Sequence, residues 1–259
     1  MIDIITLFSS SSGNCTLISG NGTKILIDIG VSVSRVCSAL SGLDFSPDLI
    51  DAIFITHEHT DHTSGLRLFM KKYRAHLYAN SPTMSKILSS LDIDGEKIHT
   101  VTENEHYTVG NLTITPFHTP HDSVSSVGYI VESDGKKYGI ATDTGTVTKE
   151  MLVALSGCEA VLIESNHDEN MLKSGPYPYY LKKRILSDLG HLSNKKCAWL
   201  ATQLAIWGTK KILLGHLSEH NNTPEIAYNE VCSLLTQNGF VPGENIVLKV
   251  ASKNEMTKI

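Results

Sequence analysis

Cysteine is scarce in this chain, and its scarcity excludes two kinds of architecture. The five cysteines are odd in number, scattered, and include no Cys-x-x-Cys pair. A small domain stapled by disulfides needs an even set of closely spaced cysteines, and a zinc site built from thiolates needs Cys-x-x-Cys pairs. The sequence therefore predicts neither a disulfide framework nor an all-cysteine metal site.

Long apolar runs and an excess of positive charge are also missing. No run approaches the roughly 18–20 residues of a membrane-spanning helix, and residues 1–13 carry Asp3 but no basic stretch like that of a signal peptide. We therefore expect a cytoplasmic protein with no membrane partner, and nothing in the sequence implies an obligatory protein partner. The formal net charge of -5 argues against a protein that coats nucleic acid generally, although a local basic surface is compatible with it.

The composition suits a sizeable hydrophobic core. Of 259 residues, 41% are hydrophobic and 19% charged, and we find no repeat or long linker, which favours a single domain over residues 1–259. Asn21-Gly22 and Asp134-Gly135 are strong hairpin signals. Strand-rich halves with interspersed helices indicate a layered α/β (α+β) fold. The expected strands include 50–55, 112–117, 127–132, 137–142, 160–163 and 211–214, and the expected helices include 179–189, 194–207 and 224–237.

Histidine is the unusual entry, with 12 in the chain. The segment Thr56-His57-Glu58-His59-Thr60-Asp61-His62 follows the apolar strand 50–55 and precedes a helical pattern that begins near residue 64. Imidazole nitrogens and a carboxylate suit zinc, iron or manganese. His57 and His59 are two residues apart, so they point the same way on extended chain. A histidine-rich surface loop is the alternative, but folding alone gives no reason for three histidines at the end of an apolar strand.

Further candidate ligands follow other predicted strands. His121-Asp122 comes after strand 112–117, Asp143 after 137–142, and His216 after 211–214. Each could be an ordinary polar loop residue, but functional residues commonly gather on loops at one edge of a sheet. Because all three occupy strand ends, the sequence predicts that they join the cluster at residues 57–62.

With these residues in place, the chain resembles the metallo-β-lactamase fold superfamily, whose signature is HxHxDH followed by a distant His, Asp and His. The resemblance implies a four-layer αββα sandwich that binds two divalent ions, zinc or manganese with iron as a further possibility. It implies the following arrangement: metal one is held by His57, His59 and His121, metal two by Asp61, His62 and His216, and Asp143 bridges them, with Asp28 supporting the site from behind. His118 competes with His121 for its place, and the Val127-Gly128-Tyr129 that follows favours His121.

The second half of the chain narrows the reaction, since the fold alone does not set the substrate. Glu164-Ser165-Asn166-His167-Asp168 follows strand 160–163, and Gly190-His191-Leu192-Ser193-Asn194 lies at a helix start. These segments resemble nucleases of this superfamily, and most specifically the YycJ (WalJ) family of small bacterial proteins considered DNA exonucleases. The resemblance implies that Glu164 orients His191, which gives a proton to the leaving oxygen.

Basic residues surround His191 in the sequence, with Asp188 the only acid between Lys173 and Lys196. Lysine and arginine supply most of the affinity for a phosphate backbone, and Tyr177, Tyr179 and Tyr180 could stack on bases. A solvated helix face and ordinary packing tyrosines are the alternatives. The candidate substrate-binding residues are His167, Lys182, Lys183, Arg184, Ser193, Asn194 and Lys195.

The sequence thus predicts a metal-dependent hydrolase of phosphodiester bonds that acts on nucleic acid, as a DNA exonuclease. Two ions would activate the attacking water, Asp61 would orient it, and the pair of Glu164 and His191 would assist the leaving group. An RNase, a small-molecule phosphodiesterase or thioesterase of the same fold, and a non-catalytic metal-binding module remain as alternatives.

Overall fold

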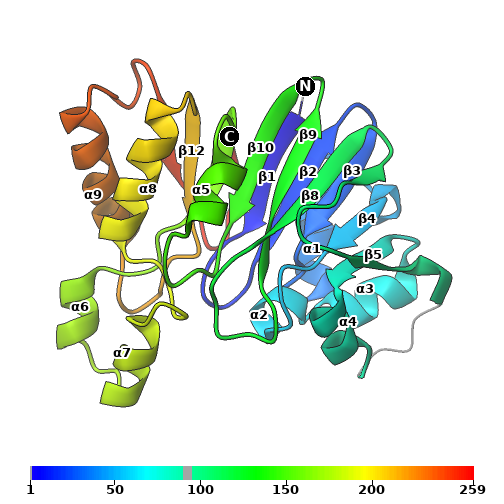
Figure 1. Cartoon of the computed structure of the whole chain (residues 1–259). Coiled ribbons are helices and arrows are strands. Elements are labelled where there is room, and N and C mark those ends of the chain that lie inside the picture. Colours follow the sequence, from blue (N-terminus) through cyan, green and yellow to red (C-terminus); the bar gives the residue numbers. More distant parts are fainter. Residues whose placement is uncertain (1, 90–94) are drawn as a thin grey trace.

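The computed structural model describes residues 2–89 and 95–259, whose strands form two sheets of seven strands each (Figure 1). The first sheet has the order β14-β1-β2-β3-β4-β5-β6 and the second has the order β13-β12-β11-β10-β9-β8-β7. The strands of the first sheet are β1 (Ile2–Phe8), β2 (Cys15–Gly20), β3 (Thr23–Ile27), β4 (Ala52–Phe54), β5 (His76–Asn80), β6 (Ile98–Val101) and β14 (Thr257–Lys258). Those of the second are β7 (Tyr107–Val109), β8 (Leu112–His118), β9 (Val127–Ser133), β10 (Lys136–Ala141), β11 (Ala160–Glu164), β12 (Lys211–Gly215) and β13 (Val247–Val250).

Helices cover the outer face of each sheet. The helices are α1 (Val33–Ser41), α2 (Thr60–Thr63), α3 (Leu66–Lys72), α4 (Ser81–Leu88), α5 (Lys149–Leu155), α6 (Glu169–Ser174), α7 (Tyr179–Ile185), α8 (Asn194–Ile206) and α9 (Pro224–Gln237), with 3-10 turns at η1 (Pro47–Leu49) and η2 (Gly95–Lys97). Apolar residues of α1, α3 and α4 pack on the first sheet, and those of α5, α8 and α9 pack on the second. Among the described residues, no helix combines the length and the apolar character needed to cross a membrane.

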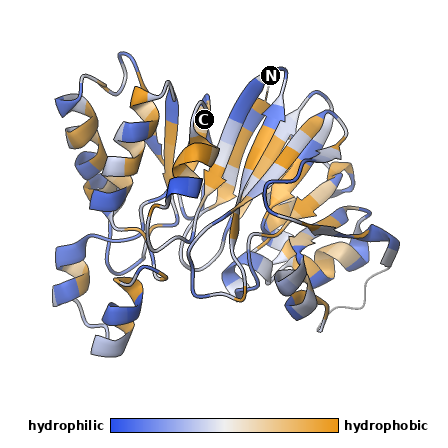
Figure 2. Cartoon of the chain, viewed as in Figure 1, coloured by the Kyte–Doolittle hydropathy of each residue, from blue (hydrophilic) through white to orange (hydrophobic). Residues whose placement is uncertain are grey.

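Three apolar layers result, and strand periodicity explains them. In β3, Ile25 and Ile27 face the layer between the two sheets, whereas Leu26 faces the helices of the first sheet. Successive side chains on a strand point to opposite faces, so a strand buried on both sides needs an unbroken apolar run. The hydropathy colouring shows the result, with orange concentrated in the central strands and blue over most of α7 (Figure 2). The predicted αββα sandwich is confirmed.

The two predicted hairpin turns are present. Asn21 and Gly22 have φ of 51° and 85°, and Asp134 and Gly135 have φ of 53° and 70°. Positive φ at both central positions is the requirement of a type I′ turn, which glycine and asparagine or aspartate meet at low cost.

One helix ends earlier than predicted. The helix expected over residues 179–189 ends as α7 at Ile185, because the chain turns back and the His191 N–H donates to the Ile185 carbonyl at 3.0 Å. Gly190 makes this turn possible, since a Cβ there would lie 2.3 Å from the carbonyl oxygens of Arg184 and Ile185. The turn brings His191 back toward the sheet edge.

Strand direction gathers the candidate residues at one edge. β3 runs parallel to β4, and β10, β11 and β12 run parallel to one another, while β9 lies antiparallel between β8 and β10. The carboxyl ends of β8, β10, β11 and β12 therefore meet at the same edge of the second sheet. The Tyr129 hydroxyl in β9 crosses the gap between the sheets and donates to the Ile55 carbonyl at 2.7 Å. This buried contact ties the second sheet to the start of the histidine segment.

We predict that Tyr129→Phe lowers the free energy of unfolding by about 1–3 kcal/mol, because it leaves the buried Ile55 carbonyl without its donor. Denaturant unfolding of the purified protein measures this. The matched control is Tyr107→Phe, whose hydroxyl makes only exposed hydrogen bonds to Glu105 and to the Thr102 amide, and it should change stability by less than about 0.5 kcal/mol. Equal stabilities for the two variants would contradict a role for Tyr129 in joining the sheets.

Candidate metal centre

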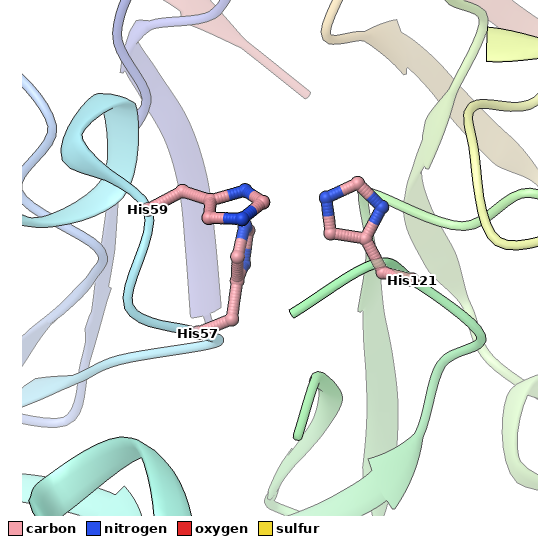
Figure 3. Close-up of side chains that lie close together, drawn as sticks. All are labelled: His57, His59 and His121. Carbon is pink, nitrogen blue, oxygen red and sulfur yellow. The ribbon is translucent and has the colours of Figure 1, made fainter. Parts of the chain in front are cut away.

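Three histidines form the first cluster. His57 and His59 come from the loop after β4, and His121 comes from the loop after β8 on the other sheet. The rings face one another across the gap between these loops (Figure 3), and one nitrogen from each lies within 4.8 Å of the others. Among the described residues, Nε2 of His57 and Nε2 of His121 are buried without a hydrogen-bond partner. Such nitrogens are costly unless a cation completes their environment.

The opposite nitrogens of these rings are held by the protein. His121 Nδ1 donates to the Gly190 carbonyl at 3.0 Å, and His57 Nδ1 lies 3.0 Å from Thr56 Oγ1. The Thr56 hydroxyl gives its own proton to Asp28, so its oxygen accepts from His57. Both Nε2 atoms therefore carry a lone pair directed at the cluster, which is the tautomer that a metal ligand needs.

A second cluster lies beside the first. It comprises Asp61, His62, Asp143 and His216, with one ligand atom from each within 4.8 Å of the others. Nε2 of His62 lies 3.1 Å from Asp143 Oδ2, and Nε2 of His216 lies 3.3 Å from Asp143 Oδ1. His121 Nε2, in the first cluster, is 3.8 Å from that same Oδ1. Asp143 is thus the residue that both clusters share.

Asp28 organises the histidine segment from behind. Its Oδ1 accepts the Thr56 N–H at 2.8 Å, and its Oδ2 accepts the Thr56 hydroxyl at 2.9 Å and His62 Nδ1 at 2.7 Å. A carboxylate behind a ligand histidine sets the ring orientation and raises its basicity.

Burial and neighbouring groups shift the pKa values of Asp143 and His57. Burial alone would raise the pKa of Asp143, but His216 and His62 outweigh it and hold that pKa well below its usual range. Burial, with neighbouring imidazoles, lowers the pKa of His57 well below its usual value, so this ring is neutral. An ionised carboxylate buried among imidazole nitrogens favours a cation at this point.

Backbone conformation sharpens the turns that place these groups. Asp28, Asp143 and His216 have φ of 61°, 56° and 55°, a region that residues other than glycine enter at some cost. Each stands immediately after or near the end of a strand, so the left-handed turn swings the side chain toward the shared edge.

Two residues that sequence reasoning missed complete the surroundings. Asn14 Nδ2 lies 3.2 Å from His62 Nε2, and Asn14 Oδ1 lies 3.3 Å from His216 Nδ1. Gly30 lets the backbone pass Asp61, since a Cβ there would lie 1.5 Å from the Asp61 carbonyl oxygen. The run Ser9–Ser12 before Gly13-Asn14 was a visible loop signal, but no spacing rule links it to residues about 50 and 200 positions away.

Glu164 and His191 are adjacent to the clusters. The hydrogen bond predicted between them is present, with His191 Nδ1 2.7 Å from Glu164 Oε1. Glu164 is fully buried, and its Oε2 accepts the Thr144 N–H at 2.8 Å. Burial alone would lower the pKa of His191, but the Glu164 carboxylate outweighs it and raises that pKa to about 9. The His191 ring centroid is 5.1 Å from that of His121.

The structure separates the members of the basic stretch. Arg184 pairs with Asp122, and Lys182 Nζ donates to the Lys173 carbonyl at 2.7 Å. Lys183 and Lys195 are exposed. The remaining candidates are buried: Ser193 caps α8, Asn194 Oδ1 accepts from Ser165 Oγ at 2.7 Å, and His167 lies beside them. His118, the competitor of His121, is exposed at the end of β8.

Comparison with known proteins gives concordant results. Residues 23–217 match the Beta-lactamase superfamily domain. The chain is 38% identical over 234 residues to the exodeoxyribonuclease WalJ of Streptococcus pneumoniae, covering 89% of this chain and 87% of that protein. It is 33% identical over 256 residues to the exodeoxyribonuclease YycJ of Bacillus anthracis, covering 98% and 96%. The fold resembles that of zinc-bound PqqB from Methylobacterium extorquens with a TM-score of 0.75, 16% identity and full coverage of both chains.

We predict that Asp143→Ala loses most of its bound divalent metal, because this carboxylate contacts both clusters. Elemental analysis of the purified protein measures the metal, and circular dichroism verifies the fold. His76→Ala is the control, since this histidine is exposed on β5 and its loss should leave metal content unchanged. Full metal content in Asp143→Ala would exclude a shared ligand.

Proposed function

Since the chain belongs to the Beta-lactamase superfamily, and within it to the family of the WalJ and YycJ exodeoxyribonucleases, we propose that it is a metal-dependent hydrolase that removes nucleotides from DNA ends. One observation carries the proposal: a three-histidine cluster and a second His/Asp cluster adjoin at Asp143 and lie beside a hydrogen-bonded carboxylate and imidazole. Clustered metal ligands alone suit binding, whereas an adjacent acid–base pair suits bond cleavage.

The two clusters fit two divalent cations, zinc or manganese, with iron as a further possibility. His57, His59 and His121 would hold one, Asp61, His62 and His216 the other, and Asp143 would contact both. When bound, such a pair supplies positive charge against the scissile phosphate and lowers the pKa of water. Imidazole nitrogens, with the tautomers of His57 and His121 fixed by hydrogen bonds, and a buried ionised carboxylate are the donor set that this chemistry requires.

Asp61 would orient the attacking water. Its side chain is 23% exposed, whereas the other residues of the second cluster are buried, and its Oδ2 lies 3.4 Å from His62 Nε2. A carboxylate that is both fixed by the cluster and open to the site can accept a proton from water and orient it.

His191 would act on the opposite side of the phosphate. The Glu164 charge favours its protonated form, and the raised pKa leaves it protonated at neutral pH, so it can give a proton to the departing oxygen. Glu164 is held in turn by the Thr144 N–H, so the pair is oriented before substrate arrives.

The DNA would lie over α7 and the start of α8. Tyr179 and Tyr180 are 81% and 72% exposed on α7, which suits stacking on unpaired bases. Lys183 on α7 and Lys195 on α8 are exposed and available to phosphates. Arg184 instead ties α7 to Asp122, the neighbour of His121, so it would position this surface relative to the metal centre.

The decisive experiment incubates the metal-loaded protein with end-labelled duplex DNA, single-stranded DNA and RNA of one sequence. Release of single nucleotides from DNA, abolished by a chelator and restored by manganese or zinc, is expected. Preferential cleavage of RNA, or cuts inside the strand, would overturn the proposed substrate or mode of attack.

We predict that Glu164→Gln and His191→Ala each slow DNA cleavage by roughly 10²–10⁴-fold, and that the double variant is little slower than His191→Ala, because the two act as a unit. Metal content should stay intact. Cleavage of a nitrophenyl phosphodiester, whose leaving group needs no proton, should be slowed much less. Proton donation by His191 would be contradicted if the rate losses of the two single variants multiplied in the double variant, or if the nitrophenyl substrate were slowed as much as DNA.

We predict that replacing Lys183 and Lys195 together by Gln reduces the slope of log affinity against log salt by about two units, since each lost phosphate contact removes about 0.9. Affinity measured over a salt series with metal-loaded protein tests this. The control replaces Lys136 and Lys211 by Gln. These lysines begin β10 and β12, at the ends of the strands that lie away from the site. An unchanged slope would assign the two lysines to an ordinary solvated surface.

A further inference from the structure

A small pocket adjoins the proposed active site and has no part in the chemistry described so far. Its volume is about 260 Å³, and its lining is His167, Glu169, Lys173, Leu186, His191, Ser193 and Lys196. This volume falls below the roughly 300–1,000 Å³ of pockets for drug-sized ligands, so it suits one small polar group with its attached sugar. His191 belongs to both the pocket and the site, which makes the two spaces neighbours.

His167 is the unusual residue of this pocket. His167 is only 1% exposed, and among the described residues neither of its ring nitrogens has a hydrogen-bond partner. Its backbone is fixed, since the His167 carbonyl accepts the Asn194 N–H at 2.9 Å. A buried polar group without a partner costs about 1–3 kcal/mol. Because the ring lines a pocket, a bound ligand with an oxygen atom would supply the acceptor that the ring N–H lacks.

The other polar groups of the pocket favour an anion. Lys173 and Lys196 contribute two positive charges and Glu169 one negative charge. Glu169 Oε2 accepts from Lys173 Nζ at 2.9 Å, and its Oε1 accepts from Ser193 Oγ at 3.3 Å. Lys196 Nζ donates to the Gly145 carbonyl at 2.9 Å and lies 3.7 Å from the exposed Asp188 carboxylate, which leaves at least one proton for a ligand. Lysine ammonium groups and an imidazole N–H are donors that bind phosphate oxygens.

We propose that this pocket binds the terminal phosphate monoester of the DNA strand and so selects strand ends for cleavage. This inference rests on the proposed function. The bond broken is that between phosphorus and the oxygen of the terminal nucleotide, so this oxygen takes the proton from His191 while the phosphate stays with the strand. The departing nucleotide then lies on the His191 side, where the pocket is. Room for one sugar with its phosphate would set that phosphate against Lys173, Lys196 and the His167 ring, and a strand that continued beyond the phosphate would exceed the volume of about 260 Å³.

The His167 ring would bind the phosphate as a neutral hydrogen-bond donor. Burial lowers the pKa of His167 to about 4, so the neutral imidazole offers one N–H donor and one acceptor. The N–H donates to a phosphate oxygen while the lysines offset its charge. A terminal hydroxyl brings no negative charge to the lysines, so phosphorylated and unphosphorylated ends are distinguished by a charge interaction within the pocket.

The test compares cleavage of DNA that carries phosphate or hydroxyl at the 5′ end or at the 3′ end, using metal-loaded protein. The expected result is at least a tenfold lower KM for one phosphorylated end over its hydroxyl counterpart, which also identifies that end. His167→Phe keeps an aromatic ring without nitrogens, and Lys173→Gln changes an exposed lysine. Each should bring the ratio of the KM for the hydroxyl end to the KM for the phosphorylated end close to one. Glu169→Gln, which removes the opposing negative charge, should raise this ratio, and Lys136→Gln should leave it unchanged.

Equal KM values for phosphorylated and hydroxyl ends, or a ratio that survives in both His167→Phe and Lys173→Gln, would overturn the inference while the nuclease function stands. If no DNA is cut, calorimetry with thymidine 5′-monophosphate, thymidine 3′-monophosphate and thymidine decides separately. Binding of a monophosphate that weakens at least tenfold in Lys173→Gln supports the pocket. Binding that is equal in the two proteins, or absent, overturns it.

Discussion

The carboxylate of Asp143, buried between the edges of the two sheets, constrains which side chains can surround it and how they are oriented. Asp143 contacts His62 and His216 at 3.1 and 3.3 Å, and removing its charge from water is stable only where positive charge or strong hydrogen bonds compensate. The neighbouring rings are held from behind by Asp28, Thr56 and Gly190 carbonyl oxygen. Their positions, and hence the loops that carry them, are adapted to one centre of positive charge.

Much of this arrangement follows from local sequence. The HxHxDH segment after an apolar strand, and single candidates after later strands, predicted a shared edge because parallel strands end together. Asn14 was not predicted, since its contact with His216 spans 202 positions and no spacing rule reaches so far. The end of α7 was also missed: its helical pattern continues past Ile185, and only the close approach of Gly190 to the helix end shows why it stops.

The basic stretch illustrates a different limit of sequence reasoning. Charge counting treats Lys182, Lys183 and Arg184 alike, yet one bonds a backbone carbonyl, one is exposed, and one pairs with Asp122. Electrostatic attraction depends on where the counter-charge lies, and that is decided by tertiary contacts between segments about 60 residues apart. The contact between Arg184 and Asp122 joins α7 to the loop of His121, and so links the surface proposed for DNA to the metal ligands.

The ligands at the sheet edge also come from widely separated parts of the chain, from His57 to His216. During synthesis, the set stays incomplete until β12 has emerged and paired with β11, so a nascent chain cannot bind a cation as the finished protein does. Binding at a hundred times the dissociation constant adds about 2.7 kcal/mol to the stability of the folded state, a large share of the total for a domain. Metal shortage would therefore act on the abundance of this protein, through proteolysis of unfolded chains, as well as on its turnover.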